Sequence, residues 1–354
     1  MKIISIFFCL LILISSVNVA VSSEPEPVDE PIIIYCFEGD EPLPTVFAVY
    51  TVEDLRAVDY QPSNIEYIEL MNDLEIMDSS WWKPIGKANK PFTREFNGNN
   101  HTITFKGDME LVPSVGSENS GCGLFGYVYN GQINDLNVIF QGNLTSFENN
   151  TGVLVGILDG NHAYDSPAIV NCHVSNDGYS VSLHSISQYS VSGKNNVGGL
   201  VGYVINGTIE NSSSDCLVTA SGNNAGGLVG LVSRGTLINS SASGSVRAVE
   251  NVGGFIGYIS NQTTISNSFA DSSVKSAGKF GNFIGNWDEN YKPDVVNSFY
   301  KEKEVDLESV PPNVPSPSIC YDRKPLQYLV VGIGIILLIA VVGIFYFKKK
   351  KVKD

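Results

Sequence analysis

The sequence has few of the residues on which enzyme chemistry and metal binding usually depend. Its 354 residues include 4 histidines, 6 cysteines and 3 tryptophans, and charged residues make up 17%. No histidine begins an HExxH motif, no CxxC pair occurs, and the cysteine spacing matches no zinc site. A GxSxG nucleophile elbow, a P-loop and an EF-hand are also absent. We therefore expect no enzyme, no cofactor and no metal.

Positive charge is also scarce. Lysine and arginine number 22 against 37 aspartates and glutamates, which gives a formal net charge of −15. Several of the lysines lie at the two ends of the chain, so the part between them is more acidic still. Nucleic acids and anionic membrane surfaces require a basic surface, so we expect no nucleic-acid partner. Solubility is the simplest role of the acidic surface.

Two apolar runs predict the cellular location. Residues 1–22 combine Lys2, an apolar core and the small-residue sequence Ala20-Val21-Ser22, the pattern of a cleaved signal peptide. Residues 326–347 carry no charge and would form a helix of about 33 Å, long enough to cross a bilayer. The lysine-rich residues 348–354 follow at once, which places the C-terminus in the cytoplasm. We expect a single-pass cell-membrane protein with an extracellular N-terminal ectodomain.

Alternatives to this topology remain open. The leader could stay as an uncleaved anchor, and the second run could be a buried core helix. A sortase-like enzyme could also remove the C-terminal run, although no LPxTG motif precedes it.

A glycine-containing phrase recurs along the middle of the chain. Gly-Gly-Leu-Val-Gly occurs at Gly198–Gly202 and Gly226–Gly230, with close variants elsewhere. The last glycines of the phrase are Gly126, Gly156, Gly202, Gly230, Gly257 and Gly285. The steps between them are 30, 46, 28, 27 and 28 residues, a period typical of stacked repeat architectures.

Each repeat contains three short strand patterns. The phrase itself lies in a five-residue apolar run, a turn follows, and a second strand ends two residues before an asparagine. These asparagines are Asn171, Asn211, Asn239, Asn267 and Asn297. A third, more polar strand completes the unit. The pattern predicts an all-β, single-stranded parallel β-helix (β-solenoid), with an N-terminal cap and a C-terminal transmembrane helix.

The repeated residues have expected structural roles. A glycine at one position of each coil allows a turn or a close approach where a Cβ atom would clash. The asparagines are expected to stack and to hydrogen-bond along the solenoid axis.

The chain divides into seven predicted segments. They are a signal peptide (1–22), an acidic Pro-rich lead-in (23–45), an N-terminal cap of the solenoid (46–115), β-helix repeats (116–300), a Pro-rich stalk (301–325), a transmembrane helix (326–347) and a basic cytoplasmic tail (348–354). The long 46-residue step predicts that residues 173–195 form an extra loop or an irregular coil. Such a loop could carry binding specificity or could be a tolerated surface insertion.

The repeats resemble the GLUG motif, whose core stands here as Gly199-Leu200-Val201-Gly202 and Gly227-Leu228-Val229-Gly230. Trp82-Lys83-Pro84-Ile85-Gly86 and the stretch Phe96–Ile103 resemble the segment that often precedes such repeats. The resemblance covers residues 50–300 and implies an adhesin-like microbial surface or secreted protein. Some GLUG proteins also carry an immunoglobulin-cleaving metallopeptidase domain, but the HExxH motif of that domain is absent here.

An extracellular repeat region makes glycosylation and disulfides relevant. Sequons that we expect to be accessible begin at Asn100, Asn143, Asn149, Asn206 and Asn261. Asn211 and Asn239 also begin sequons, but an internal asparagine ladder would prevent them from carrying glycans. Cys320, in the predicted stalk, is a candidate for an interchain disulfide because the mature chain would keep an odd number of cysteines.

These observations predict a membrane-anchored cell-surface glycoprotein that acts in adhesion or cell-envelope interaction without catalysis. Its partner would be a glycan or a protein on another cell or on the envelope. One alternative is a structural envelope component without a specific ligand. The other is a carbohydrate-active β-helix enzyme, which would need carboxylates gathered on one face. The aspartates of the repeats do not recur at one register, which argues against the enzyme.

Overall fold

The computed structural model describes residues 33–34, 37–38, 41–42, 45–77, 81–112, 121–160, 168–176, 180–182, 185–187, 189–301 and 303–304. The predicted signal peptide, transmembrane helix and cytoplasmic tail lie outside these residues, as do Cys320 and most of the lead-in and stalk. No helix within the described ranges is long and apolar enough to cross a membrane.

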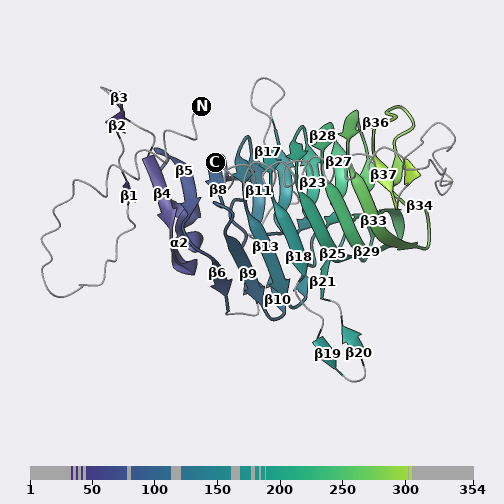
Figure 1. Ribbon diagram of the computed structural model, residues 1–354, viewed down its shortest axis with the longest axis horizontal. Coiled ribbons are helices and arrows are strands. Elements are labelled where there is room, and N and C mark those ends of the chain that lie inside the picture. The colour runs from purple at the N-terminus through teal and green to yellow at the C-terminus, as the bar shows by residue number, and fades with distance from the viewer. Residues whose placement is uncertain are drawn as a thin grey trace, which may run out of the picture.

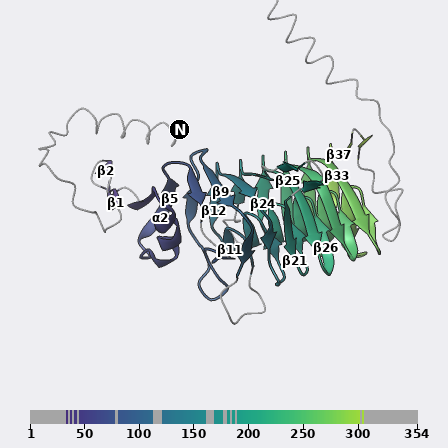
Figure 2. The same ribbon diagram turned by 90° about the horizontal axis from the view of Figure 1, so that it is seen from below.

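The described chain is mostly β, and it winds into stacked coils whose strands form parallel sheets along one axis (Figures 1 and 2). The phrase that carries the repeated glycines forms a six-stranded sheet, here called the GLUG sheet. Its strands are β11 (Phe125–Tyr129), β16 (Val155–Asp159), β23 (Val201–Ile205), β27 (Val229–Ser233), β31 (Ile256–Ile259) and β35 (Ile284–Trp287).

A five-stranded sheet, here called the short sheet, precedes the GLUG sheet in each coil. It consists of β15 (Thr151–Gly152), β22 (Val197–Gly198), β26 (Asn223–Gly226), β30 (Glu250–Gly253) and β34 (Phe280–Gly281). These strands were not anticipated from the sequence, because two apolar or small residues are too few to give a strand pattern.

The second strand of each coil belongs to a ten-stranded sheet. Its members are β1 (Ile33–Ile34), β4 (Thr45–Val49), β5 (Ile65–Leu70), β8 (Glu95–Asn97), β12 (Gln132–Asn134), β17 (Ala168–Val170), β24 (Thr208–Glu210), β28 (Gly235–Ile238), β32 (Thr263–Ser266) and β36 (Asp294–Val296). All its pairs are parallel except β1 with β4.

The third strand belongs to a thirteen-stranded sheet. Its main path contains β6 (Leu74–Ile76), β9 (Thr102–Lys106), β13 (Asn137–Gln141), β18 (His173–Asn176), β25 (Ser213–Ala220), β29 (Ser241–Ala248), β33 (Phe269–Ser276), β37 (Phe299–Tyr300) and β38 (Lys303–Glu304). Four short strands extend it: β7 (Trp81–Trp82), β10 (Met109–Leu111), β14 (Leu144–Thr145) and β21 (Ser190–Gly193). The three predicted strand patterns of each repeat therefore lie in three different parallel sheets, as a solenoid requires.

The N-terminal end of the solenoid carries the two short helices. Thr51 caps α2 (Val52–Ala57), because its hydroxyl accepts a hydrogen bond from Asp54 N (3.1 Å) while the Asp54 carboxylate accepts one from Thr51 N (2.9 Å). The 3₁₀ helix η1 (Val58–Tyr60) follows directly. Strand β8 pairs in parallel with β12, so the sheets continue without a break from residues 46–115 into the repeats. Outside the solenoid sheets, β2 (Phe37–Glu38) and β3 (Glu41–Pro42) form a small hairpin.

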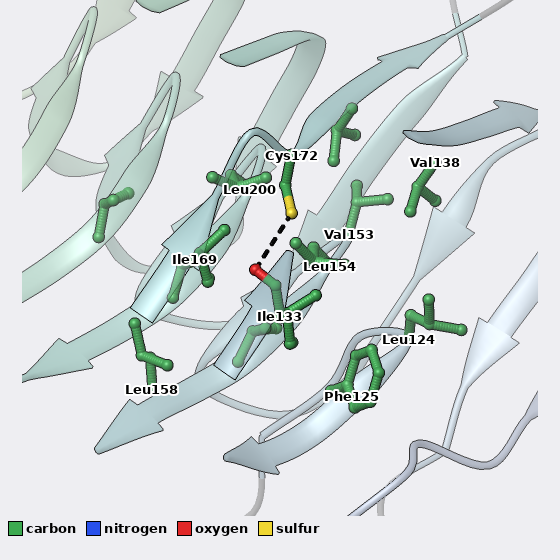
Figure 3. Close-up of a cluster of buried hydrophobic side chains, with 14 of the residues drawn as sticks. Leu124, Phe125, Ile133, Val138, Val153, Leu154, Leu158, Ile169, Cys172 and Leu200 are labelled. Carbon is green, nitrogen blue, oxygen red and sulfur yellow. Dashed lines mark hydrogen bonds between the residues drawn. The ribbon is translucent and has the colours of Figure 1, made fainter. Parts of the chain in front are cut away.

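Apolar side chains from all coils fill the interior. Ile133, Ile169, Ile209, Leu237 and Ile265 occupy one column of the ten-stranded sheet, and none of them is exposed. Figure 3 shows how side chains of the GLUG sheet, the ten-stranded sheet and the thirteen-stranded sheet meet in this core. Residues at the same position of successive coils thus form successive layers of one continuous core.

Close backbone contact explains the repeated glycines. A Cβ atom on Gly202 would lie 2.5 Å from Thr151 N in the short sheet of the previous coil, and one on Gly198 would lie 2.8 Å from Gly230 N. The same clash recurs at Gly226 with Gly257 N (2.6 Å). The short sheet and the GLUG sheet are therefore in backbone contact at these positions. The glycines permit a close approach rather than a turn.

The asparagines that follow the second strand lie at an exposed corner of each coil. Asn171, Asn211, Asn239, Asn267 and Asn297 all have positive φ angles between 48° and 54°. Asn239 Nδ2 donates to Asn211 Oδ1 (3.1 Å), and Asn171 Nδ2 donates to Asp135 Oδ1 (2.9 Å). The hydrogen-bonded column exists, but it lies on the outside. An internal ladder at Asn211 and Asn239 is therefore wrong, because an asparagine side chain in this left-handed turn points to solvent.

The serines next to these asparagines form the buried ladder instead. Ser212, Ser240, Ser268 and Ser298 are at most 1% exposed. Each Oγ accepts a hydrogen bond from the backbone N–H one coil earlier and donates to the carbonyl two residues before it. Cys172 occupies the same position one coil earlier, with its N–H bonded to Ser212 Oγ (3.1 Å).

A second asparagine ladder runs along the start of the short-sheet strands and ends at Asn286 in strand β35 of the GLUG sheet. Asn196 Nδ2 donates to Asn150 Oδ1 (2.7 Å), Asn224 to Asn196 (2.7 Å) and Asn251 to Asn224 (2.8 Å). Asn286 continues it by donating to Asn251 Oδ1 (3.0 Å). This partly buried ladder was missed in the sequence, although a signal was present: Asn150, Asn196, Asn224 and Asn251 each stand two residues before a glycine.

The long repeat step produces an extra hairpin. Strand β18 pairs with the first half of β25 and β21 pairs with its second half, so together they replace one strand. The antiparallel hairpin of β19 (Ser180–Ser182) and β20 (Ser185–Ser187) lies between them and projects from the solenoid (Figure 1). The insertion is thus a loop rather than an additional coil.

Replacing Gly230 by alanine tests the backbone contact. Its Cβ atom would lie 2.4 Å from Asn196 C and 2.5 Å from Val197 N, and neither backbone atom can move aside alone. We expect the free energy of unfolding to fall by about 2–3 kcal/mol, measured by denaturant titration. Gly278→Ala is the control, since its Cβ atom would first meet the flexible Glu250 side chain at 3.1 Å. A change of less than about 1 kcal/mol is expected there, and equal effects of the two substitutions would contradict the contact.

The serine ladder makes a second prediction. Cys172→Ser should change the free energy of unfolding by less than about 1 kcal/mol, since a hydroxyl there meets the partners of the other ladder serines. Ser240→Ala should cost about 1–3 kcal/mol, because the buried Ser212 N–H loses its acceptor. Thermal or chemical unfolding of both variants checks the comparison. A larger loss for Cys172→Ser than for Ser240→Ala would rule out the shared role.

Candidate functional site

The outer side of the GLUG sheet carries a regular column of large side chains. Strand register aligns Tyr127, Ile157, Tyr203, Leu231, Tyr258 and Asn286, one from each strand of the sheet. We call this column the tyrosine stripe. At this position the first, third and fifth strands of the sheet have tyrosine. The second and fourth strands, each between two tyrosines, have an aliphatic residue.

The stripe lies on the side of the sheet that faces away from the core. The neighbouring positions of the same strands, such as Val128 and Val204, are fully buried members of the core. Tyr127, Tyr203 and Tyr258 are only partly buried, and none of them packs against the core cluster. Ile157 is 2% exposed yet lies outside that cluster. Since Ile157 is flanked in register by Tyr127 and Tyr203, the stripe forms a packed layer of its own on the sheet surface.

Polar groups beside the stripe interact with the tyrosine hydroxyls. The Tyr127 hydroxyl donates a hydrogen bond to Asp159 Oδ2 in the next coil. Tyr203 is hydrogen-bonded to Ser233, again one coil further on, and Tyr258 lies near the carboxylate of Asp288. The rings of Tyr127 and Tyr203 are therefore directed towards the following coil along the axis.

Burial and the neighbouring carboxylates keep these phenols neutral. Burial, the hydrogen bond to Asp159 and the negative charge of that carboxylate all raise the pKa of Tyr127. Burial also raises the pKa of Tyr203 more than its hydrogen bond to Ser233 lowers it. Burial and the charge of Asp288 raise the pKa of Tyr258. The three hydroxyls thus remain hydrogen-bonding groups well above neutral pH.

The GLUG sheet contains no basic residue. None of its six strands includes lysine, arginine or histidine, whereas Asp159 lies in β16 and Asp288 directly follows β35. The stripe is therefore an aromatic and aliphatic surface with polar and acidic neighbours, which disfavours anionic ligands.

The predicted repeat residues form the scaffold beneath this surface. The repeated glycines lie in the strands of the GLUG sheet, and the predicted asparagines lie at the exposed corner after the ten-stranded sheet. They are not brought together into a pocket. The stripe itself was missed, although the signal was present: tyrosine directly follows the last glycine of the phrase at Tyr127, Tyr203 and Tyr258.

The predicted glycosylation sites differ in the hydrogen bonds that their asparagine side chains form. Asn100 is exposed, and the Asn261 Oδ1 accepts a hydrogen bond from Gln262 N (2.8 Å). The Asn149 Oδ1 accepts one from Asn195 Nδ2 (2.8 Å). At Asn143 and Asn206 the Nδ2 atom, to which a glycan would attach, already donates to Asp108 Oδ1 (3.0 Å) and Gly160 O (3.0 Å).

The described cysteines are buried thiols rather than nucleophiles or disulfides. Cys122, Cys172 and Cys216 are free and at most 1% exposed. Burial raises the pKa of each of these thiols to about 12, so none is a thiolate at neutral pH. Within the described ranges, no group of three or more His, Cys, Asp or Glu side chains could hold a metal ion.

The geometry defines a parallel β-solenoid repeat protein. Residues 193–215, which include β22 and β23, match the family model described as the GLUG motif. The match confirms the resemblance that the repeats show, and it is consistent with a GLUG-motif repeat protein.

Comparison with solved structures supports the same fold. The chain is similar to a Bacteroides ovatus protein whose structure is described as that of a "putative immunoglobulin A1 protease", with a TM-score of 0.57 and 18% sequence identity. The similarity covers 81% of this chain and 87% of that one. At this identity the likeness concerns the fold alone. No curated protein sequence matches the chain.

The raised phenol pKa values predict the behaviour of the stripe in alkali. An unfolded tyrosine titrates near pH 10, so the stabilisation from the neutral native phenols is complete below that pH and falls as pH rises above it. A triple Tyr127→Phe, Tyr203→Phe, Tyr258→Phe variant should therefore lose less stability between pH 9 and 11 than the parent chain.

Absorbance of phenolate gives the direct measurement. The difference between parent and triple variant should titrate at a higher pH in the native chain than in the same chain unfolded in urea. Coincident titration curves in the two states would show that the three phenols are not shielded.

Proposed function

We propose that this chain is a non-catalytic, membrane-anchored surface protein whose solenoid presents the tyrosine stripe for adhesion or for contact with a cell envelope. The signal-like leader, the apolar run at 326–347 and the lysine-rich end support the anchoring. The GLUG motif and the parallel β-solenoid fold support a surface protein.

The observation that carries the proposal is the tyrosine stripe. Tyr127, Tyr203, Leu231 and Tyr258 lie partly exposed in one column along the GLUG sheet. Burial inside the protein does not account for this column, because its tyrosines do not pack on the core. Tyrosine is favoured at binding surfaces, since it combines a large apolar ring with a polar tip at low conformational cost.

The chemistry that surrounds the stripe supports the non-catalytic part of the proposal. Asp159 and Asp288 lie four strands apart in the GLUG sheet, so the two carboxylates cannot flank one glycosidic bond. The Asp159 carboxylate is also engaged by the Tyr127 hydroxyl.

Adhesion of cells that display the full-length chain tests the proposal. A Tyr127→Ala, Tyr203→Ala, Tyr258→Ala variant should reduce adhesion about tenfold or more, as expected when several aromatic anchors are removed. The matched control is Thr236→Ala, Thr264→Ala, which changes an equally regular column on the ten-stranded sheet and leaves the sequon at Asn206 intact. The control should adhere like the parent chain.

Surface exposure must be measured in the same experiment. Antibody binding to intact cells should be equal for the parent, the stripe variant and the control, and a C-terminal tag should be reachable only after permeabilisation. Equal adhesion of stripe variant and parent at equal surface level would reject the stripe as the adhesive surface. A tag that is accessible on intact cells would reject the proposed topology.

A further inference from the structure

The spacing of the tyrosine stripe indicates the kind of ligand. Neighbouring strands of a sheet lie about 4.8 Å apart, so tyrosines on every second strand recur about every 9.6 Å. The repeating disaccharide of an extended β-1,4-linked polysaccharide has about this length. A chain of that type, laid along the solenoid axis, would place one sugar ring of each disaccharide at a tyrosine.

The direction of the tyrosine rings fits such a chain. Tyr127 and Tyr203 hydrogen-bond to Asp159 and Ser233, each one coil further along the axis. The two rings therefore extend along the sheet surface, and the Tyr127 ring is directed towards the coil that contains Ile157, which is 2% exposed. A ring that extends over a sheet can offer its face to the apolar face of a sugar.

The polar groups beside the stripe complete the match. Asp159, Ser233 and Asp288 lie along one side of the stripe and supply acceptors for sugar hydroxyls. None of the strands of the GLUG sheet contains a basic residue, and Arg234 is the one basic residue that directly follows a strand of this sheet, whereas Asp159 and Asp288 lie beside the stripe. We therefore expect neutral sugars to bind more tightly than uronic acids and sulfated sugars, whose charges would approach these carboxylates.

We propose that the tyrosine stripe binds an uncharged, extended β-1,4-linked polysaccharide aligned with the solenoid axis, one disaccharide unit for every two coils. This inference rests on the proposed adhesive function and specifies its ligand. Tyr127, Tyr203 and Tyr258 provide three stacking positions, and the partly exposed Leu231 supports the sugar between the last two, while Ile157 is buried and does not contact the sugars. Each position alone binds weakly, and the affinity arises from simultaneous contact along the chain.

Binding of neutral oligosaccharides to the full-length chain in detergent tests the proposal. Cellulose-, chitin- and mannan-derived oligomers of two, four and six sugars serve as probes in calorimetry. We expect the affinity for at least one series to rise steeply from two to six sugars, because longer oligomers reach a second and a third tyrosine. A hexamer of galacturonic acid is the charged control and should bind at least about tenfold more weakly.

Substitutions at the central tyrosine locate the site. Tyr203→Ala should weaken hexasaccharide binding about tenfold or more, while Tyr203→Phe should keep most of it because the ring remains. Thr236→Ala on the ten-stranded sheet is the matched control and should bind like the parent. If Tyr203→Ala does not fold, the hexasaccharide affinity of Tyr258→Ala replaces it. The dependence of affinity on oligomer length in the parent chain then provides the second test.

Three results would overturn the proposal. They are affinity that is independent of oligomer length, galacturonate binding as tight as neutral binding, and an unchanged affinity in folded Tyr203→Ala. If stripe-dependent cell adhesion persists while no neutral oligosaccharide binds, the ligand is a protein and only this inference fails. If adhesion does not depend on the stripe, the proposed function itself fails.

Discussion

The fold depends on direct backbone contact between the short sheet and the GLUG sheet. At Gly198, Gly202 and Gly230 a single added carbon would lie within 2.0–2.8 Å of neighbouring backbone atoms. Any other residue would push the two sheets apart and open a gap where contact now excludes water. The coil is therefore narrow on this side, and one coil stacks on the next without an offset. This constraint explains why the glycines recur while the residues between them vary.

Stacking in register turns each coil position into a column with one physical role. Interior columns hold aliphatic side chains, and the buried serine column satisfies backbone N–H groups that the tight corner leaves without partners. The two asparagine columns stabilise left-handed turns at two corners. Local stereochemistry explains each of these columns, so ligand binding is not needed to account for any of them.

The tyrosine stripe is different, because the fold does not require it. The same position of the GLUG sheet holds different residues in different coils, since β27 has leucine where β23 has tyrosine. The regular alternation of aromatic and aliphatic side chains is therefore a property of this surface and not of the coil. A repeat scaffold converts such an alternation into a fixed spacing along one axis, which suits a ligand that itself repeats.

The repeated phrase in the sequence was sufficient to predict the parallel solenoid, its period and three of its four strands per coil, because glycine spacing and apolar runs report local backbone requirements. The extra loop at 173–195 also followed from local pattern. Tertiary structure decided which side of a coil each residue faces: Asn211 lies outside while Ser212 lies inside, since the left-handed turn between them reverses the direction of the side chains. It also decided that Tyr127, Tyr203 and Tyr258 form one stripe, because only the strand register brings residues from different coils into one line.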